Sequence, residues 1–191
     1  MTDLADRRGL ETDVYQPAED SYLLVEAATD AIDATDRVLD LGTGSGYVGS
    51  EIRSATGAAV VASDVNPLAC RQARVRGLPT IRGFLVEPFF ADTFDVVLFN
   101  PPYLPVAEEA KRDDWMEVAL TGGENGRAVI DPFVETVGRV LTRRGRVFLV
   151  ASTLSGLDEI RRTANEAGFE VRTVERESFP FEELVVLEMK R

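Results

Sequence analysis

The chain has 191 residues, of which 45% are hydrophobic, and its formal net charge is −12. This length and composition predict a single domain over 1–191 with one sizeable core, and the acidic charge disfavours non-specific binding to nucleic acid phosphates. One cysteine, Cys70, and no histidine exclude an internal disulfide and histidine acid/base chemistry; only carboxylates remain as metal ligands, and we expect no metal site.

The N-terminal part is expected to be an extension over 1–16 followed by a helix that begins at Pro17. Residues 1–13 lack the apolar middle of a secretion signal, and no apolar run approaches the roughly 20 residues that span a bilayer. We therefore expect a cytoplasmic protein without a membrane contact. Apolar residues at helical spacing support the helix: Leu23, Leu24, Ala27 and Ala28.

Five apolar runs then alternate with helical patterns. Their apolar character is continuous, which is typical of parallel strands covered on both faces. The predicted strands are RVLDLG (37–42), AVVASDV (59–65), TIRGFLV (80–86), FDVVLFN (94–100) and GRVFLVAS (145–152). The predicted helices between them are 46–56, 67–76 and 127–142, with Gly145 expected as a left-handed residue just past the last one.

The C-terminal part follows a different pattern. A helix over 156–167, ended by Gly168, precedes two strands that SFPF joins without an intervening helix, FEVRTVERES (169–178) and ELVVLEMK (183–190). Strands joined in this way must pair antiparallel. The sequence therefore predicts an α/β fold with a seven-stranded, mostly parallel sheet and a C-terminal antiparallel hairpin.

A glycine-rich turn ends the first predicted strand in VLDLGTGSGYVG. Gly42, Gly44 and Gly46 would let a ligand approach backbone N–H groups at the carboxyl edge of the sheet. Asp40 would repel the pyrophosphate of a dinucleotide but would attract the ammonium and sulfonium groups of S-adenosylmethionine. Asp64, at the end of the second strand, offers two oxygens to a ribose diol. The alternatives are a nicotinamide dinucleotide site or ordinary strand-end caps.

The fourth predicted strand ends in FNPPYLP, which is unusually stiff. An amide or exocyclic amino nitrogen is a poor nucleophile because its lone pair is delocalised. The Asn100 side-chain oxygen and the Pro101 carbonyl could accept its two N–H bonds and turn the lone pair towards a methyl donor. Pro101 and Pro102 would stiffen the turn, and Tyr103 would offer a flat face for stacking. The alternative is a strand closed by a simple proline turn.

Taken in order, VYQPAEDSYLL, VLDLGTGSG, ASDVNPLA, FDVVLFNPPYLP and GGENGRAVID resemble the HemK/PrmC-type protein-glutamine methyltransferases, in the short archaeal and eukaryotic form. The resemblance implies a Rossmann-like class I methyltransferase fold that uses S-adenosylmethionine, leaves S-adenosylhomocysteine, and methylates the GGQ glutamine of a class I release factor. It further implies that certain residues contact the cofactor or hold the amide, namely Ser21, Asp40, Gly42, Asp64 and Asn100, with Pro101 to Tyr103 completing the clamp.

The third predicted strand departs from the family, which usually has an acidic residue followed by an apolar one at its tip. Phe84 and Leu85 stand there instead, and Phe84 cannot accept a hydrogen bond from the adenine amino group, so we expect weaker cofactor binding or an altered adenine pose. The resemblance also implies a small zinc-binding activator subunit. An apolar edge strand over 80–90 would suit it, and the alternative is burial of those side chains under the following loop.

Several expectations stay open at this point. The acidic segment 104–126 is expected to be a lid over the substrate or a solvated surface loop, and Glu19 and Asp20 to lie at the cleft mouth or to cap a helix. NPPY also occurs in amino-methyltransferases of DNA and RNA, and a binding module without turnover is a further alternative. With Lys111 and Lys190 as its only lysines, the acidic chain resembles proteins of halophilic archaea or is an ordinary acidic protein.

Overall fold

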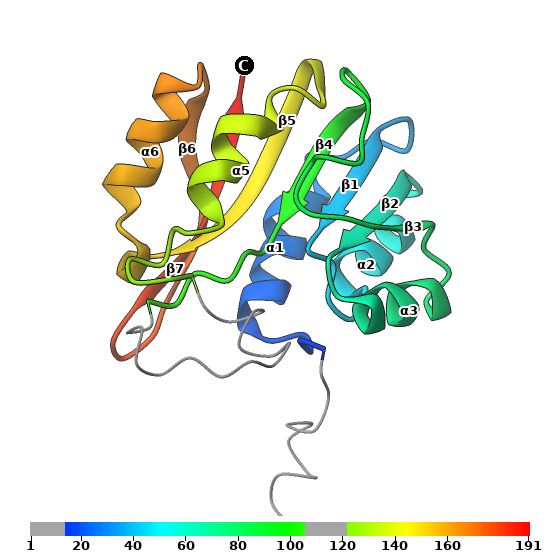
Figure 1. Cartoon of the computed structure of the whole chain (residues 1–191), viewed down its shortest axis with the longest axis horizontal. Coiled ribbons are helices and arrows are strands. Elements are labelled where there is room, and N and C mark those ends of the chain that lie inside the picture. Colours follow the sequence, from blue (N-terminus) through cyan, green and yellow to red (C-terminus); the bar gives the residue numbers. More distant parts are fainter. Residues whose placement is uncertain (1–13, 106–121) are drawn as a thin grey trace, which may run out of the picture.

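The computed structural model describes residues 14–105 and 122–191, and its sheet has seven strands in the order β3-β2-β1-β4-β5-β7-β6 (Figure 1). The strands are β1 (Arg37–Leu41), β2 (Ala59–Asp64), β3 (Thr80–Arg82), β4 (Phe94–Phe99), β5 (Leu141–Ser152), β6 (Glu170–Ser178) and β7 (Glu183–Lys190). The helices are α1 (Glu19–Thr29), α2 (Tyr47–Thr56), α3 (Pro67–Val75), α5 (Ile130–Val137) and α6 (Leu157–Glu166), with a short 3-10 helix η2 (Thr153–Ser155).

The pairing of the strands confirms the predicted class. β1 pairs parallel with both β2 and β4, β2 with β3, and β4 with β5, whereas β7 pairs antiparallel with both β5 and β6. The carboxyl ends of the five parallel strands therefore lie at one edge of the sheet, and the strand order reverses between β1 and β4. Ligands of open α/β sheets bind outside such a switch point.

Helices cover the sheet on both faces, as the continuous apolar strands predicted (Figure 1). α5 and α6 pack on one face around Phe133 and Ile160, and α1, α2 and α3 contribute Leu24, Ile52 and Ala73 to the core on the other. Within 14–105 and 122–191, no helix has the length and apolar character needed to cross a membrane.

The third strand is shorter than predicted: β3 ends at Arg82, so 83–86 is not strand. The Gly83 N–H still donates to the Asp64 carbonyl oxygen, but the chain then turns, and Leu85 adopts a φ of +44°. Val86 and Phe89 are buried against the α5 face of the sheet. A buried turn therefore produces the same apolar pattern as a buried strand, which explains why the prediction was wrong there.

The predicted helix over 127–142 was also too long, because α5 covers only Ile130–Val137 and β5 already begins at Leu141. Gly145 does not follow the helix in a left-handed conformation but lies inside β5. The β4–β5 register shifts between Phe94 and Val96, which pair with Leu141 and Arg146. The extra residues on β5 occupy this irregularity, and the buried Leu141 continues the apolar pattern of the helix across the boundary.

Candidate functional site

A pocket opens at the carboxyl edge of the sheet, where β1, β2 and β4 end. It brings together most of the residues predicted for the site: Gly42, Gly44, Asp64, Phe84, Leu85, Asn100, Pro101, Pro102 and Tyr103. A smaller pocket adjoins it, sharing Tyr15, Gly42 and Asn100, and is lined by Ser21 and Asp40. Gly46 lies in neither pocket: as the residue before α2 it packs against Ala73 of α3, so it shapes the turn from outside.

The Asp64 carboxylate at the tip of β2 joins the glycine turn after β1 to β2 by accepting hydrogen bonds from backbone N–H groups. The Gly44 N–H donates to one oxygen of Asp64 at 2.9 Å, and the Asn66 N–H donates to the other at 2.8 Å. Burial raises the pKa of the Asp64 carboxyl, although these N–H groups oppose the shift. Gly44 has a φ of +53°, and a Cβ there would lie 3.2 Å from the Tyr15 carbonyl oxygen. Glycine therefore meets both a conformational and a steric requirement.

Asp40 lies beneath this turn and does not line the main pocket. Its carboxylate accepts hydrogen bonds from the Thr43 hydroxyl and from the Gly49 N–H on α2. Burial raises the pKa of Asp40 to about 6, with the two hydrogen bonds acting in the opposite direction. Asp40 thus joins β1, the glycine turn and α2, and it reaches only the smaller pocket.

Asn100 follows directly after β4 and lines both pockets. Its side-chain oxygen is buried and has no hydrogen-bond partner among the described residues. A buried polar atom left unpaired costs about 1–3 kcal/mol, so such atoms are rare and call for an explanation. An acceptor of this kind in a pocket wall suits a ligand that brings an N–H group.

Tyr103, the last residue of the NPPY turn, is held by a residue 83 positions earlier. Its hydroxyl donates to the Asp20 carboxylate at 3.1 Å, and the Tyr15 hydroxyl donates to the same oxygen at 2.7 Å. Asp20 is 3% exposed and lines the pocket, while Glu19 is exposed. Of the expected pair at the cleft mouth, only Asp20 joins the site; Tyr15 was not predicted as a site residue at all.

The NPPY turn is also supported from outside the pocket, by the segment GGENGR (122–127) and by η2. The Gly122 N–H donates to the Leu104 carbonyl oxygen at 2.9 Å, and the Ser155 hydroxyl donates to the Tyr103 carbonyl oxygen at 3.3 Å. Gly126 lies so close that a Cβ there would come within 2.4 Å of the Tyr103 carbonyl oxygen. Most of the segment expected as a lid, 106–121 of 104–126, lies outside the described residues.

Phe84 and Leu85 line the main pocket just after the end of β3. The Phe84 side chain is about half exposed, and Leu85 is buried. The turn after Arg82, rather than a strand tip, presents them to the pocket.

The site suits a nucleoside-bearing methyl donor. The glycine turn leaves room for close approach of a ligand, and Asp64 and the buried Asn100 oxygen line the same pocket as acceptors, such as a ribose diol and an N–H group would need. Among the described residues no group of three or more metal-ligating side chains occurs. The residues that line the two pockets can contribute positioning and electrostatics.

Comparisons with known proteins show what the chain is similar to in family and fold. The model of the methyltransferase small domain family matches residues 18–116. A Methanocaldococcus jannaschii protein assigned as a protein N5-glutamine methyltransferase is 34% identical, with 93% of this chain and 92% of the relative covered. The human methyltransferase HEMK2 is 32% identical over 87% of this chain and 84% of its own. A solved structure of the E. cuniculi Mtq2–Trm112 complex is described as responsible for the methylation of the translation termination factor eRF1. It resembles this chain with a TM-score of 0.78 and 28% sequence identity, and the match covers 94% of this chain and 99% of that chain.

Proposed function

This chain belongs to the methyltransferase small domain family and, within it, to the short HemK2/Mtq2-type protein N5-glutamine methyltransferases, and from this membership we propose that its substrate is the GGQ glutamine of a class I release factor. Family membership implies S-adenosylmethionine as methyl donor. Relatives support the substrate: the fission yeast protein, 25% identical, is named an eRF1 methyltransferase catalytic subunit.

The cofactor would occupy the two adjoining pockets. Gly42 and Gly44 would admit it close to the backbone, Asp64 would accept from its ribose hydroxyls, and Ser21 and Asp40 line the smaller pocket, where its charged end would lie. When bound, it supplies an electrophilic methyl group. The negative charge of Asp40 would favour the sulfonium over a neutral analogue.

The clamp would act on the substrate amide. Asn100 would accept one N–H of the glutamine side chain through its open oxygen, and the Pro101 carbonyl would accept the other. Both bonds would draw the nitrogen out of conjugation and turn its lone pair towards the methyl group. Pro101 and Pro102 would hold this geometry, with Tyr103 stacking on the planar amide.

Within the site, the observation that supports this proposal is the buried side-chain oxygen of Asn100 in the pocket wall, which has no hydrogen-bond partner among the residues that the structure describes. Incubation with labelled S-adenosylmethionine and separate samples of a class I release factor, DNA and ribosomal RNA tests it. We expect label in the release factor alone, and none when its GGQ glutamine is replaced. Label in DNA or RNA instead would favour an amino-methyltransferase of nucleic acids.

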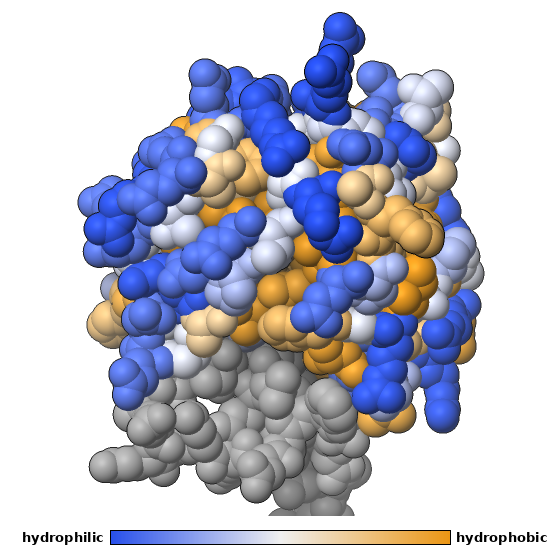
Figure 2. Space-filling model, turned by 45° about the horizontal axis from the view of Figure 1, so that its top comes forward, coloured by the Kyte–Doolittle hydropathy of each residue, from blue (hydrophilic) through white to orange (hydrophobic). Residues whose placement is uncertain are grey.

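We further propose that a Trm112-type subunit binds at the β3 edge. β3 ends the sheet with only three residues, and its Ile81 is 41% exposed. In the connection after β3, Phe90 is 87% exposed, although Val86 and Phe89 are buried. Figure 2 shows more apolar surface on the side of the β3–β4 connection than over α6. Such a surface invites a partner. Full activity and a monodisperse state of the protein alone would contradict this.

A further inference from the structure

We propose that Asp20 is a positioning residue that fixes the ring of Tyr103 in the substrate clamp and ties it to Tyr15 beside the glycine turn. This inference rests on the proposed function for its effect on turnover. It carries a second effect, on cofactor binding, that does not depend on the substrate.

The hydrogen bonds of Asp20 show that it acts through other residues. One carboxylate oxygen accepts from the Tyr15 and Tyr103 hydroxyls, and the other accepts from the Ser21 N–H at 2.6 Å and the Ser21 hydroxyl at 3.2 Å. An ionised carboxylate has about four acceptor directions, so these four bonds from described residues fill it. Although Asp20 lines the pocket, no acceptor site is left for a ligand.

The position of Asp20 in the fold explains how a buried charge is tolerated there. It lies in the first turn of α1, where the helix dipole favours an anion, and four donors replace the lost water. Burial, and next the charge of Asp20, raise the pKa of both phenols above their ordinary value, so that Tyr15 and Tyr103 remain protonated donors. Asp20 is therefore a fixed anchor for two hydroxyl groups from distant parts of the chain.

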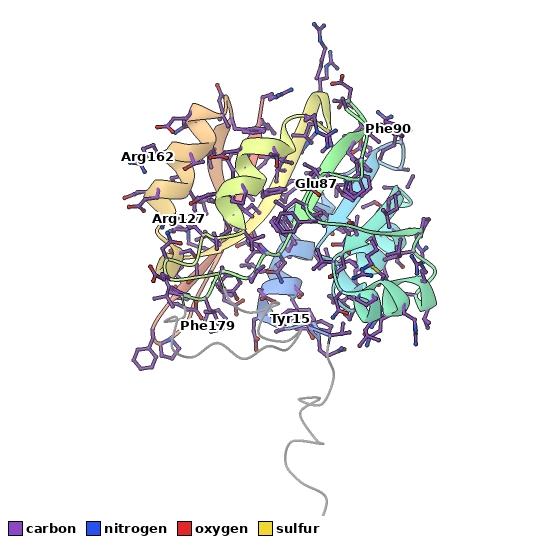
Figure 3. The ribbon with its side chains drawn as sticks, viewed as in Figure 1. Tyr15, Glu87, Phe90, Arg127, Arg162 and Phe179 are labelled. Carbon is purple, nitrogen blue, oxygen red and sulfur yellow. The ribbon has the colours of Figure 1, made fainter. Side chains whose placement is uncertain are left out.

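The two tyrosines form different parts of the site. Tyr103 belongs to the turn after β4, whereas Tyr15 precedes α1, and its carbonyl oxygen lies against Gly44 of the glycine turn. Figure 3 shows Tyr15 at the lower end of the molecule, next to the start of α1. Tyr15 lines both pockets, so a shift of Asp20 would move the wall on the cofactor side and the clamp on the substrate side together.

Two double-mutant cycles test the inference. Asp20→Asn keeps the size of the side chain, but its NH2 group replaces one carboxylate oxygen, so either the two phenol hydroxyls or the Ser21 N–H and hydroxyl lose their acceptor. The first cycle measures the cofactor Kd by titration without substrate, for Asp20→Asn, Tyr15→Phe and the pair. We expect each single variant to raise Kd several-fold, and the pair to raise it no further.

The second cycle measures kcat with the methyl acceptor for Asp20→Asn, Tyr103→Phe and the pair. A misplaced group can cost about 100-fold in rate, so we expect a 10- to 100-fold loss in kcat for each single variant. The double variant should lose no more than the single variants do, because both substitutions break the same contact. Tyr22→Phe, on the exposed side of α1, is the matched control and should change neither Kd nor kcat.

Multiplying effects in either cycle, or wild-type Kd and kcat for a folded Asp20→Asn, would overturn the inference. Thermal melting shows which variants are folded. If the wild-type protein methylates no release factor, the proposed substrate fails, while the cofactor cycle still supports or overturns the role of Asp20.

Discussion

Gly49 of α2 lies directly against Asp40 of β1. Its backbone N–H donates to the Asp40 carboxylate at 2.9 Å, and a Cβ on Gly49 would approach the same oxygen to 2.8 Å. The helix can therefore reach the buried carboxylate only because residue 49 has no side chain.

Gly49→Ala should destabilise the protein, although alanine is the better helix former by up to about 1 kcal/mol. The buried carboxylate cannot move aside, and overpacking of this kind costs about 1–3 kcal/mol. Urea unfolding measures the change, with Ser54→Ala at an exposed position of the same helix as the control. A Gly49→Ala variant at least as stable as wild type would show that Asp40 and α2 separate easily.

Cofactor affinity should rise with pH through about 6, because the raised pKa of Asp40 leaves it neutral below that value and anionic above it. Asp64, whose charge contributes to this shift and whose own pKa is raised by burial, titrates in the same direction. A carboxylate attracts the sulfonium and a carboxyl does not, so the gain accompanies deprotonation. Titrations between pH 5 and 8 should show this rise for wild type and a smaller one for Asp40→Asn. Equal pH dependence in both proteins would exclude Asp40 as its source.

The raised pKa of Asp40 affects the stability of the ligand-free protein in the opposite direction from its effect on cofactor affinity. The folded state holds the Asp40 proton up to a higher pH than the unfolded chain does, so the contribution of Asp40 to stability falls as the pH rises from about 4 to about 6. Asp40→Asn should remove this fall, and urea unfolding across that window measures it.

Glu188 should stabilise the part of the sheet formed by β5, β6 and β7 through its ion pairs. It is 1% exposed on β7 and pairs with Arg172, with Lys190 at 2.9 Å and with Arg146 at 3.6 Å. Burial would raise its pKa, but the hydrogen bonds and charges of Lys190 and Arg172 outweigh burial and lower it. We expect Glu188→Gln to cost about 1–3 kcal/mol, less than a fully buried pair because the cations reach water.

That difference in unfolding free energy should be complete above the unfolded pKa of about 4.3 and should shrink as the pH falls through the lower folded pKa. Glu177→Gln, at an exposed position of β6, should leave the free energy of unfolding unchanged at every pH. A Glu188→Gln cost that did not change with pH would assign the loss to packing rather than to charge.

Phe84→Asp should bind the cofactor several-fold more tightly, since a carboxylate at this pocket wall can accept from the adenine amino group and one such hydrogen bond is worth about 1 kcal/mol. Phe84→Leu separates the new acceptor from the lost ring. Calorimetric titration measures the cofactor Kd of wild type, Phe84→Asp and Phe84→Leu. Unchanged or weaker binding by Phe84→Asp would contradict the expectation.

Local motifs made much of the site predictable. The glycines and the NPPY turn follow a strand and Asp64 ends one, so the parallel topology alone brings them to one edge. Asp20 was expected at the cleft mouth or as a helix cap, but its contact with Tyr103, 83 positions away, could not be predicted from local motifs, and neither could the part of Tyr15. The contact between Gly49 and Asp40 could not be predicted either, since nothing near Gly49 in the sequence indicates it.

The order and type of the strands and helices were predicted, and the errors came at boundaries. The turn after β3 and the passage from α5 to β5 bury Val86 and Leu141 as completely as a strand or helix would, so an apolar pattern cannot mark where the element ends. Adaptation to high salt stays a prediction, which melting at low and multimolar salt would test.

The open oxygen of Asn100 is best tested by the transfer of label to a class I release factor by wild type and by Asn100→Ala, each assayed alone and with a Trm112-type subunit, with cofactor Kd measured in parallel. We predict that Asn100→Ala binds the cofactor within a few-fold of wild type yet loses about 100-fold or more in turnover. Near wild-type turnover by a cofactor-bound Asn100→Ala would contradict the clamp.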